Sequence, residues 1–221
     1  MQRGEPAQRP RRLGGISRAS AVGVGYRGLG PQPAWVSERE RVAPVDLAFD
    51  RVLIDTPDLV AFVAAVHVYP SGFSFTFSSR MRPTASAAVG DAFAEEFSHG
   101  LEQPVPAEEA ERGLRLGVRL ADGRGAAFNP NHPWVAHADP EPYALPTIHS
   151  GRRSSDFRIF ECELWVFDLP EEGDVTLFYR WLALGVPEDS VVFDGDALRA
   201  AAARAVVLWD SPAAEIPKSE A

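Results

Sequence analysis

An alternation of apolar and polar residues over positions 73–82 is the feature that most constrains the fold. Phenylalanine stands at positions 73, 75 and 77, with serine and threonine between them. Successive side chains of a strand point to opposite faces of a sheet, so this pattern predicts a half-buried strand. Residues 59–69 are apolar at nearly every position, which indicates a strand buried on both faces. Because Pro70-Ser71-Gly72 is a turn sequence, the two segments predict a β-hairpin.

Other segments repeat this period of two. Residues 114–120 alternate, and Asp122-Gly123 is a hairpin turn signal that leads to a short partner at 124–128. Residues 156–169 and 174–182 also alternate, and we expect them to pair with each other across the turn at 170–173. A first strand is predicted over 47–54, closed by Thr56-Pro57, and a last short one at 190–193.

Two segments instead have a helical period. Residues 84–101 place an apolar side chain at every fourth position, which predicts a short helix. An apolar stripe from Leu198 to Trp209 predicts a C-terminal amphipathic helix, with Asp194 or Asp196 as its N-cap.

The predicted elements indicate a mostly β chain. Seven or eight strands with two peripheral helices favour an antiparallel β-sandwich, Ig-like or jelly-roll-like, with a C-terminal amphipathic helix and one short helical insertion. A flattened barrel is the alternative. Residues 1–44 are rich in Gly, Pro and Arg without periodicity, and we interpret them as a disordered basic arm. The single sandwich domain is then expected at 45–210, with a disordered tail at 211–221.

Charge is distributed unevenly along the chain. The arm has eight arginines against three glutamates, a net charge of +5, whereas residues 45–221 hold 14 basic and 28 acidic residues, a net charge of −14. An acidic body repels phosphate, so nucleic acid is not an expected partner except for weak contact through the arm. We expect a protein partner or self-association instead. No run of about 18 apolar residues predicts a membrane span, and the one cysteine, Cys162, excludes an internal disulfide, so the cytoplasm is the expected compartment.

Two glutamates are candidates for acid-base catalysis. Glu161 and Glu163 fall on the same side of one predicted strand, with Cα atoms about 6.8 Å apart. Some glycosidases carry their two carboxyl groups at such a spacing on a strand face, and Trp165 on that face would stack on a sugar. The alternative is cross-strand pairing with arginines such as Arg80 on a solvated face, which needs no substrate.

A metal site is the second hypothesis. The proline-rich segment 129–155 carries His132, His137 and His149 together with Asp139, and imidazole with carboxylate is a donor set that zinc accepts. Surface histidines in a long loop explain the same residues without a metal. His67 lies in the buried strand pattern, where a hydrogen-bonded core residue is the simpler interpretation.

Evidence for other chemistry is weak. A GxGxxG match at Gly23–Gly28 follows no predicted strand, so no nucleotide cofactor is expected. Cys162 alternates with core residues, which favours a buried thiol over a nucleophile. These absences favour a non-enzymatic binding or interaction module. The many aromatic residues of the strands suggest a left-over apolar surface; they are Phe73, Phe75, Phe77, Trp165, Phe167, Phe178 and Trp181. An enzyme or a small-ligand or metal-binding protein with its site in 129–155 is the alternative.

Several short motifs resemble a group of uncharacterised proteins from GC-rich, actinobacterium-like genomes. They are Tyr69-Pro70-Ser71-Gly72-Phe73, Leu114–Val118 with Ala121-Asp122-Gly123, Leu164-Trp165-Val166, and Leu184–Glu188. The resemblance implies a β-sandwich-like domain that begins near Val45. It implies no activity, cofactor or catalytic residue.

Overall fold

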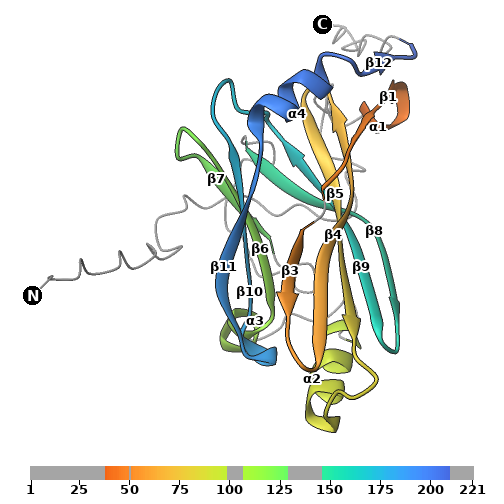
Figure 1. Cartoon of the computed structure of the whole chain (residues 1–221), viewed down its shortest axis with the longest axis vertical. Helices are drawn as coiled ribbons and strands as arrows, with labels where there is room; N and C mark the ends of the chain where they lie inside the picture. The colour runs from red at the N-terminus through yellow and green to blue at the C-terminus, as the bar shows by residue number, and fades with distance from the viewer. Residues whose placement is uncertain (1–37, 50, 99–106, 129–145, 210–221) are drawn as a thin grey trace, which may run out of the picture.

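Two antiparallel sheets face each other across a shared apolar interior (Figure 1). The computed structural model describes residues 38–49, 51–98, 107–128 and 146–209. The larger sheet has the order β2-β4-β5-β9-β8, with β3 beside β2 on the same edge of β4. Its strands are β2 (Val45–Leu47), β3 (Val52–Asp55), β4 (Leu59–Tyr69), β5 (Gly72–Met81), β8 (Thr147–Asp156) and β9 (Ile159–Phe167).

The smaller sheet has four strands in the order β11-β10-β6-β7. They are β6 (Leu114–Leu120), β7 (Gly125–Phe128), β10 (Val175–Trp181) and β11 (Val186–Phe193). The predicted hairpins β4–β5 and β6–β7 are both present. The predicted antiparallel sandwich is therefore confirmed, since the strands form separate facing sheets.

Side chains from both sheets fill the interior. Phe73, Phe75 and Phe77 of β5 are fully buried there, as are Leu177 and Trp181 of β10. Tyr179 connects the sheets, because its hydroxyl donates a hydrogen bond of 2.5 Å to the backbone carbonyl of Leu53 on β3. The period of two seen in the sequence thus marks the inward faces of both sheets.

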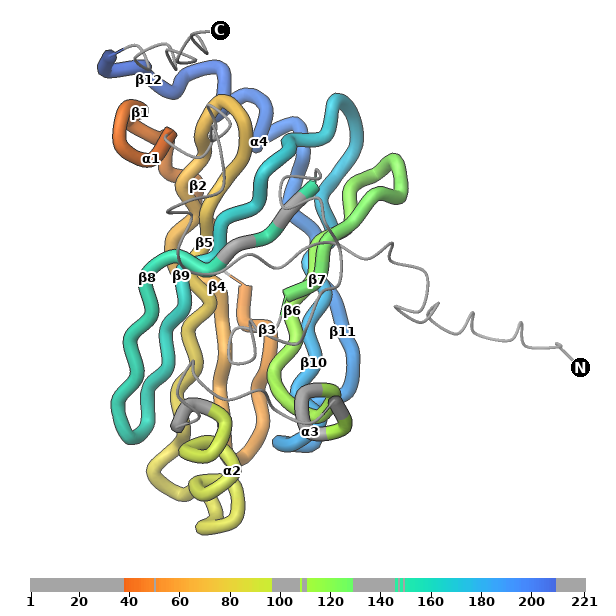
Figure 2. Tube along the Cα trace, turned by 180° about the vertical axis from the view of Figure 1, so that it is seen from behind, coloured from red at the N-terminus to blue at the C-terminus, as the bar shows by residue number. Residues whose placement is uncertain are grey.

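Helices cover the two ends of the sandwich (Figures 1 and 2). α2 (Ala87–Ser98) and α3 (Ala107–Arg112) lie at one end, beside the 3-10 turn η2 (Leu182–Leu184). α4 (Gly195–Ala202) lies at the other end, against β2 and β4. No helix in the described segments is long and apolar enough to cross a bilayer.

The predicted pairing of 156–169 with 174–182 is wrong. β9 lies between β5 and β8 in the larger sheet, while β10 lies between β6 and β11 in the smaller one. The turn at 170–173 therefore carries the chain from one sheet to the other. Alternation identifies a half-buried strand but not its partner, so the sequence pattern is the same for both pairings.

The predicted loop 129–155 is also partly wrong, because β8 begins at Thr147. Of this loop, residues 129–145 lie outside the described part of the chain. β8 is an edge strand of mainly polar residues, with a bulge between Ser150 and Arg153. An edge strand packs on one neighbour only, so it shows little of the apolar periodicity that predicts strands.

The C-terminal helix is shorter than predicted. Asp194 is its N-cap, and its carboxylate accepts a hydrogen bond of 3.0 Å from the backbone N–H of Ala197. The helix ends at Ala202, and Val206–Val207 then form β12, which pairs with β1 (Val42–Ala43). The β-branched pair Val206-Val207 favours a strand over a helix, which explains the early end.

The folded part begins before the predicted boundary at Val45. α1 (Glu38–Arg41) and β1 pack against the body, and Val42 is buried. The carboxylate of Glu38 accepts hydrogen bonds from the hydroxyl and the backbone N–H of Ser71, at 2.6 and 3.3 Å. These few residues carry no periodicity of their own, so only their contacts reveal that they belong to the domain. The predictions for residues 1–37 and 211–221 lie outside the described residues.

Candidate functional site

Glu161 forms an ion pair. Its Oε1 lies 2.7 Å from Nη2 of Arg80 on the neighbouring strand β5 and accepts a hydrogen bond of 3.2 Å from the Ser78 hydroxyl. The hydrogen bond from Arg80 holds the pKa of Glu161 below its ordinary value. A lowered pKa keeps the carboxyl group ionised at neutral pH, whereas a general acid needs a raised one.

Glu163 also faces arginine. Its Oε2 lies 3.6 Å from Nη1 of Arg39 and accepts a hydrogen bond of 3.4 Å from the backbone N–H of Arg152 in the β8 bulge. The Trp165 side chain on the same face is buried against Tyr69, with 4.8 Å between ring centroids, and the Arg39 guanidinium lies 5.7 Å from the tryptophan ring. The pair of Glu161 with Arg80 is the cross-strand pairing of the alternative, whereas the arginine beside Glu163 comes from α1. The indole ring is covered where a sugar would stack.

Asp46, His67 and Ser74 form a row of hydrolase-type residues across three strands of this face. Asp46 lies opposite His67, whose Nδ1 is 2.6 Å from the aspartate Oδ1, and His67 lies opposite Ser74. Ser74 is fully buried on the central strand β5, which is paired with a neighbour on each side. A nucleophile needs access to its substrate and nearby N–H donors for the oxyanion, and the ladder already uses those of this strand. The hydrogen bond that we expected for His67 is present, although its side chain is partly exposed.

The metal hypothesis falls mostly outside the described residues. His132, His137 and Asp139 lie there, and His149 is in β8, opposite Trp165. Within the described segments, no group of three His, Cys, Asp or Glu residues is placed to hold a metal ion. The metal site in 129–155 therefore stays a prediction.

Cys162 is buried in the sheet interior, as predicted. Burial raises the pKa of its thiol to about 12. The reactive form of cysteine is the thiolate, which is scarce at such a pKa, so the side chain acts as a small apolar core residue.

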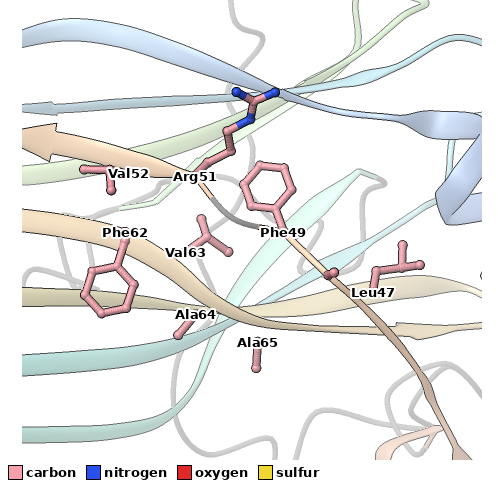
Figure 3. A pocket seen from close by; sticks show the side chains of 9 residues that line it. Leu47, Phe49, Arg51, Val52, Phe62, Val63, Ala64 and Ala65 are labelled. Atoms are coloured by element: carbon pink, nitrogen blue, oxygen red, sulfur yellow. The ribbon is translucent and has the colours of Figure 1, made fainter.

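A groove at the outer edge of the larger sheet was not predicted (Figure 3). It forms because β2 pairs with residues 66–68 of β4 and β3 pairs with 60–62, so the edge of β4 between them has no registered partner. Its volume is about 520 Å³. The lining residues are mainly apolar: Leu47, Ala48, Phe49, Arg51, Val52, Phe62, Val63, Ala64 and Ala65.

Two contacts fix the segment between β2 and β3 beside β4. The Phe49 ring packs on Phe193 of the opposite sheet, with 4.3 Å between centroids. The backbone N–H of Val63 donates a hydrogen bond of 3.3 Å to the Arg51 carbonyl. Ala64 and Ala65 fall in a bulge of β4, and their short side chains leave space that larger residues would fill. In the sequence, the two consecutive alanines in a mainly apolar strand are the signal of this site.

An exposed apolar strip is the second unpredicted surface. It consists of Val206, Val207, Leu208 and Trp209, whose exposed fractions are 58, 49, 54 and 55%. The sequence pattern assigns these residues to a helix face that packs on the sheet. Because α4 ends at Ala202, they instead lie on and after β12, away from the interior. The last backbone contact described here is the hydrogen bond of 2.8 Å from the Leu208 N–H to the Arg41 carbonyl.

Most of the aromatic residues expected to form a left-over apolar surface are buried instead. The phenylalanines of β5 and Trp181 lie between the sheets, whereas Trp165 and Phe167 pack beside Val42 on the outer face of the larger sheet. Phe73, Phe75, Phe77, Trp165, Phe167 and Trp181 are all buried. Phe178 is partly exposed and lies under the Arg119 guanidinium, 4.7 Å from its ring centroid. The contiguous exposed apolar residues are those of the C-terminal strip, and none of the predicted aromatic residues belongs to it.

Comparisons of the chain with protein-family models, with curated proteins and with solved structures give no match. The geometry of these surfaces is therefore the basis for assigning a function.

Proposed function

We propose that this protein is a non-enzymatic interaction module that binds another protein, or a second copy of itself, through the apolar strip Val206–Trp209. The observation that supports this is the exposure of four consecutive large apolar side chains at one end of a well-packed sandwich. Scattered exposed apolar residues are normal, but a contiguous group is typical of an interface. Trp209 is a tryptophan, one of the residue types enriched among the energetically dominant residues of protein interfaces.

The geometry of the strip fits a partner surface better than a small ligand. β1 and β12 form a two-stranded sheet at the end of the molecule (Figure 1), so the strip lies on a projecting surface. Small-molecule sites are concave, whereas protein interfaces are commonly flat or convex. The cytoplasm is the proposed compartment, because the chain has a single cysteine and that cysteine is buried.

Light scattering coupled to size exclusion tests the self-association form of the proposal. If the strip binds a second copy, the full chain elutes as a dimer or larger oligomer, and the double variant Val207→Ser/Trp209→Ser is a monomer. Phe157→Ser is the matched control, because Phe157 is 80% exposed at the tip of the β8–β9 hairpin, away from the strip. The control keeps the oligomeric state of the wild type.

Site-specific crosslinking tests the partner form. A photo-crosslinking residue at Leu208 should capture one specific protein in cells, while the same residue at position 157 does not. The double variant should lose that complex and keep its melting temperature. A monomeric wild type together with no specific adduct from position 208 would overturn the proposal.

A further inference from the structure

The edge groove has the size and lining of a small-molecule site, independently of the apolar strip. Its volume of about 520 Å³ falls within the range of about 300–1,000 Å³ that ligand pockets occupy. Apolar side chains form most of its wall, and one charged residue, Arg51, is the exception among the described lining residues. Such a lining suits a ligand with an apolar body and a single polar group.

The length of the gap in the hydrogen-bond ladder excludes an added strand. Ala64 and Ala65 have no registered partner on either neighbouring strand. Two residues span roughly 7 Å of strand, and β2 and β3 already occupy the edge of β4 on both sides of them. An extended peptide needs a longer open edge than this to pair with. The groove therefore fits a compact ligand better than a peptide.

The charge in the groove selects the polar group of the ligand. Arg51 is exposed and makes no ion pair with any residue that the structure describes. Other arginines of the body do have carboxylate partners, as Arg80, Arg82 and Arg124 illustrate. Because no described carboxylate pairs with it, the Arg51 guanidinium is available for an anion from solution. Figure 3 shows Arg51 and Phe49 on one side of the groove and the two alanines on the other.

We propose that this groove binds an amphiphilic carboxylate of the fatty-acid type. Its apolar chain lies over Ala64 and Ala65, against Phe62 and Val52, and its carboxylate pairs with the Arg51 guanidinium. The exposed side chain of Val52, at 61%, forms the rim that the bound chain covers.

Binding of decanoate, used below its micellar concentration, tests this proposal. In a ¹H–¹⁵N spectrum of the full chain, decanoate should shift the amide signals of Ala64, Ala65 and Val52 in a saturable way. Arg51→Gln should weaken decanoate binding about tenfold, the loss expected for one charge-assisted hydrogen bond. Decanol lacks the charge, so it should bind the wild type and Arg51→Gln equally.

Two further variants separate the site from general effects. Ala65→Leu fills the groove and should abolish binding while the melting temperature stays within a few degrees. Arg158→Gln removes an exposed arginine from the β8–β9 hairpin and should leave binding unchanged. Shifts that do not saturate, shifts away from the groove, or equal decanoate affinity of wild type and Arg51→Gln would each overturn the proposal. None of these results bears on the apolar strip, whose test is the oligomeric state and the crosslink.

Discussion

Replacing Glu96 by alanine should destabilise the protein strongly, although Glu96 is a charged residue on a helix at one end of the sandwich. Glu96 is only 7% exposed. Its Oε1 accepts a hydrogen bond of 3.1 Å from the backbone N–H of Leu114, and its Oε2 accepts one of 3.2 Å from the indole N–H of Trp181. Leu114 and Trp181 are opposite each other at the ends of β6 and β10. One carboxylate thus holds the helix to both strands.

The magnitude follows from the two buried donors. Each would lose this acceptor, at a cost of about 1–3 kcal/mol per donor, so we expect Glu96→Ala to lower the free energy of unfolding by about 4 kcal/mol. For a domain of this size, such a change lowers the melting temperature by about 8–16 °C. Glu96→Gln keeps one acceptor oxygen but turns an amide N–H toward the other donor, so its loss should be intermediate.

Urea unfolding followed by tryptophan fluorescence and far-UV circular dichroism measures this loss. Asp91→Ala is the matched control, because Asp91 is an exposed carboxylate on the same helix. Its effect should stay within about 0.5 kcal/mol, as is usual for surface substitutions. A loss below about 1 kcal/mol for Glu96→Ala would refute the reasoning, because it would mean that water replaces the carboxylate at both donors.

Three other measurements test features described above. The lowered pKa of Glu161 means that its pair with Arg80 stabilises the fold above the ordinary glutamate pKa of 4.5 and loses this effect as the pH falls through the lowered value, so Glu161→Gln should flatten the acid side of the pH–stability curve. The difference should be below about 1 kcal/mol, because both side chains are more than one-third exposed. With a pKa of about 12, Cys162 should resist a thiol reagent at pH 8 in the native protein and react once urea unfolds it. A chain that begins at Val45 should be about 1.5–3 kcal/mol less stable in urea than one that begins at Glu38, because it lacks the buried valine of β1; equal stability would show that this segment contributes nothing to the fold.

The sequence by itself determined the central strands β4 and β5 of the larger sheet and the two hairpins. The alternation at 73–79 and the apolar run at 59–69 identify β5 and β4 with boundaries close to those observed, because burial of one face imposes a period of two on a strand. The turn residues between them, and Asp122-Gly123, also identify both hairpins, since a two-strand hairpin is a local structure. The sandwich class follows from the number of such strands.

Only the tertiary structure decided which strands are neighbours. The alternating sequences of β9 and β10 are compatible both with a hairpin and with strands of opposite sheets. The choice between these pairings depends on contacts between residues far apart in the chain. The same holds for the edge strand β8, which packs on one neighbour and so carries little periodicity. Glu96 is a charged residue on an amphipathic helix, and its acceptor role exists only where Leu114 and Trp181 meet it.

Both proposed surfaces have the same origin. The groove depends on where β2 and β3 pair along β4, and the apolar strip depends on where α4 ends. In each case the residues are ordinary apolar ones whose sequence pattern predicts burial. They are exposed because the neighbouring element ends before it covers them. The periodicity of a segment indicates its own secondary structure but not where the adjacent elements begin and end.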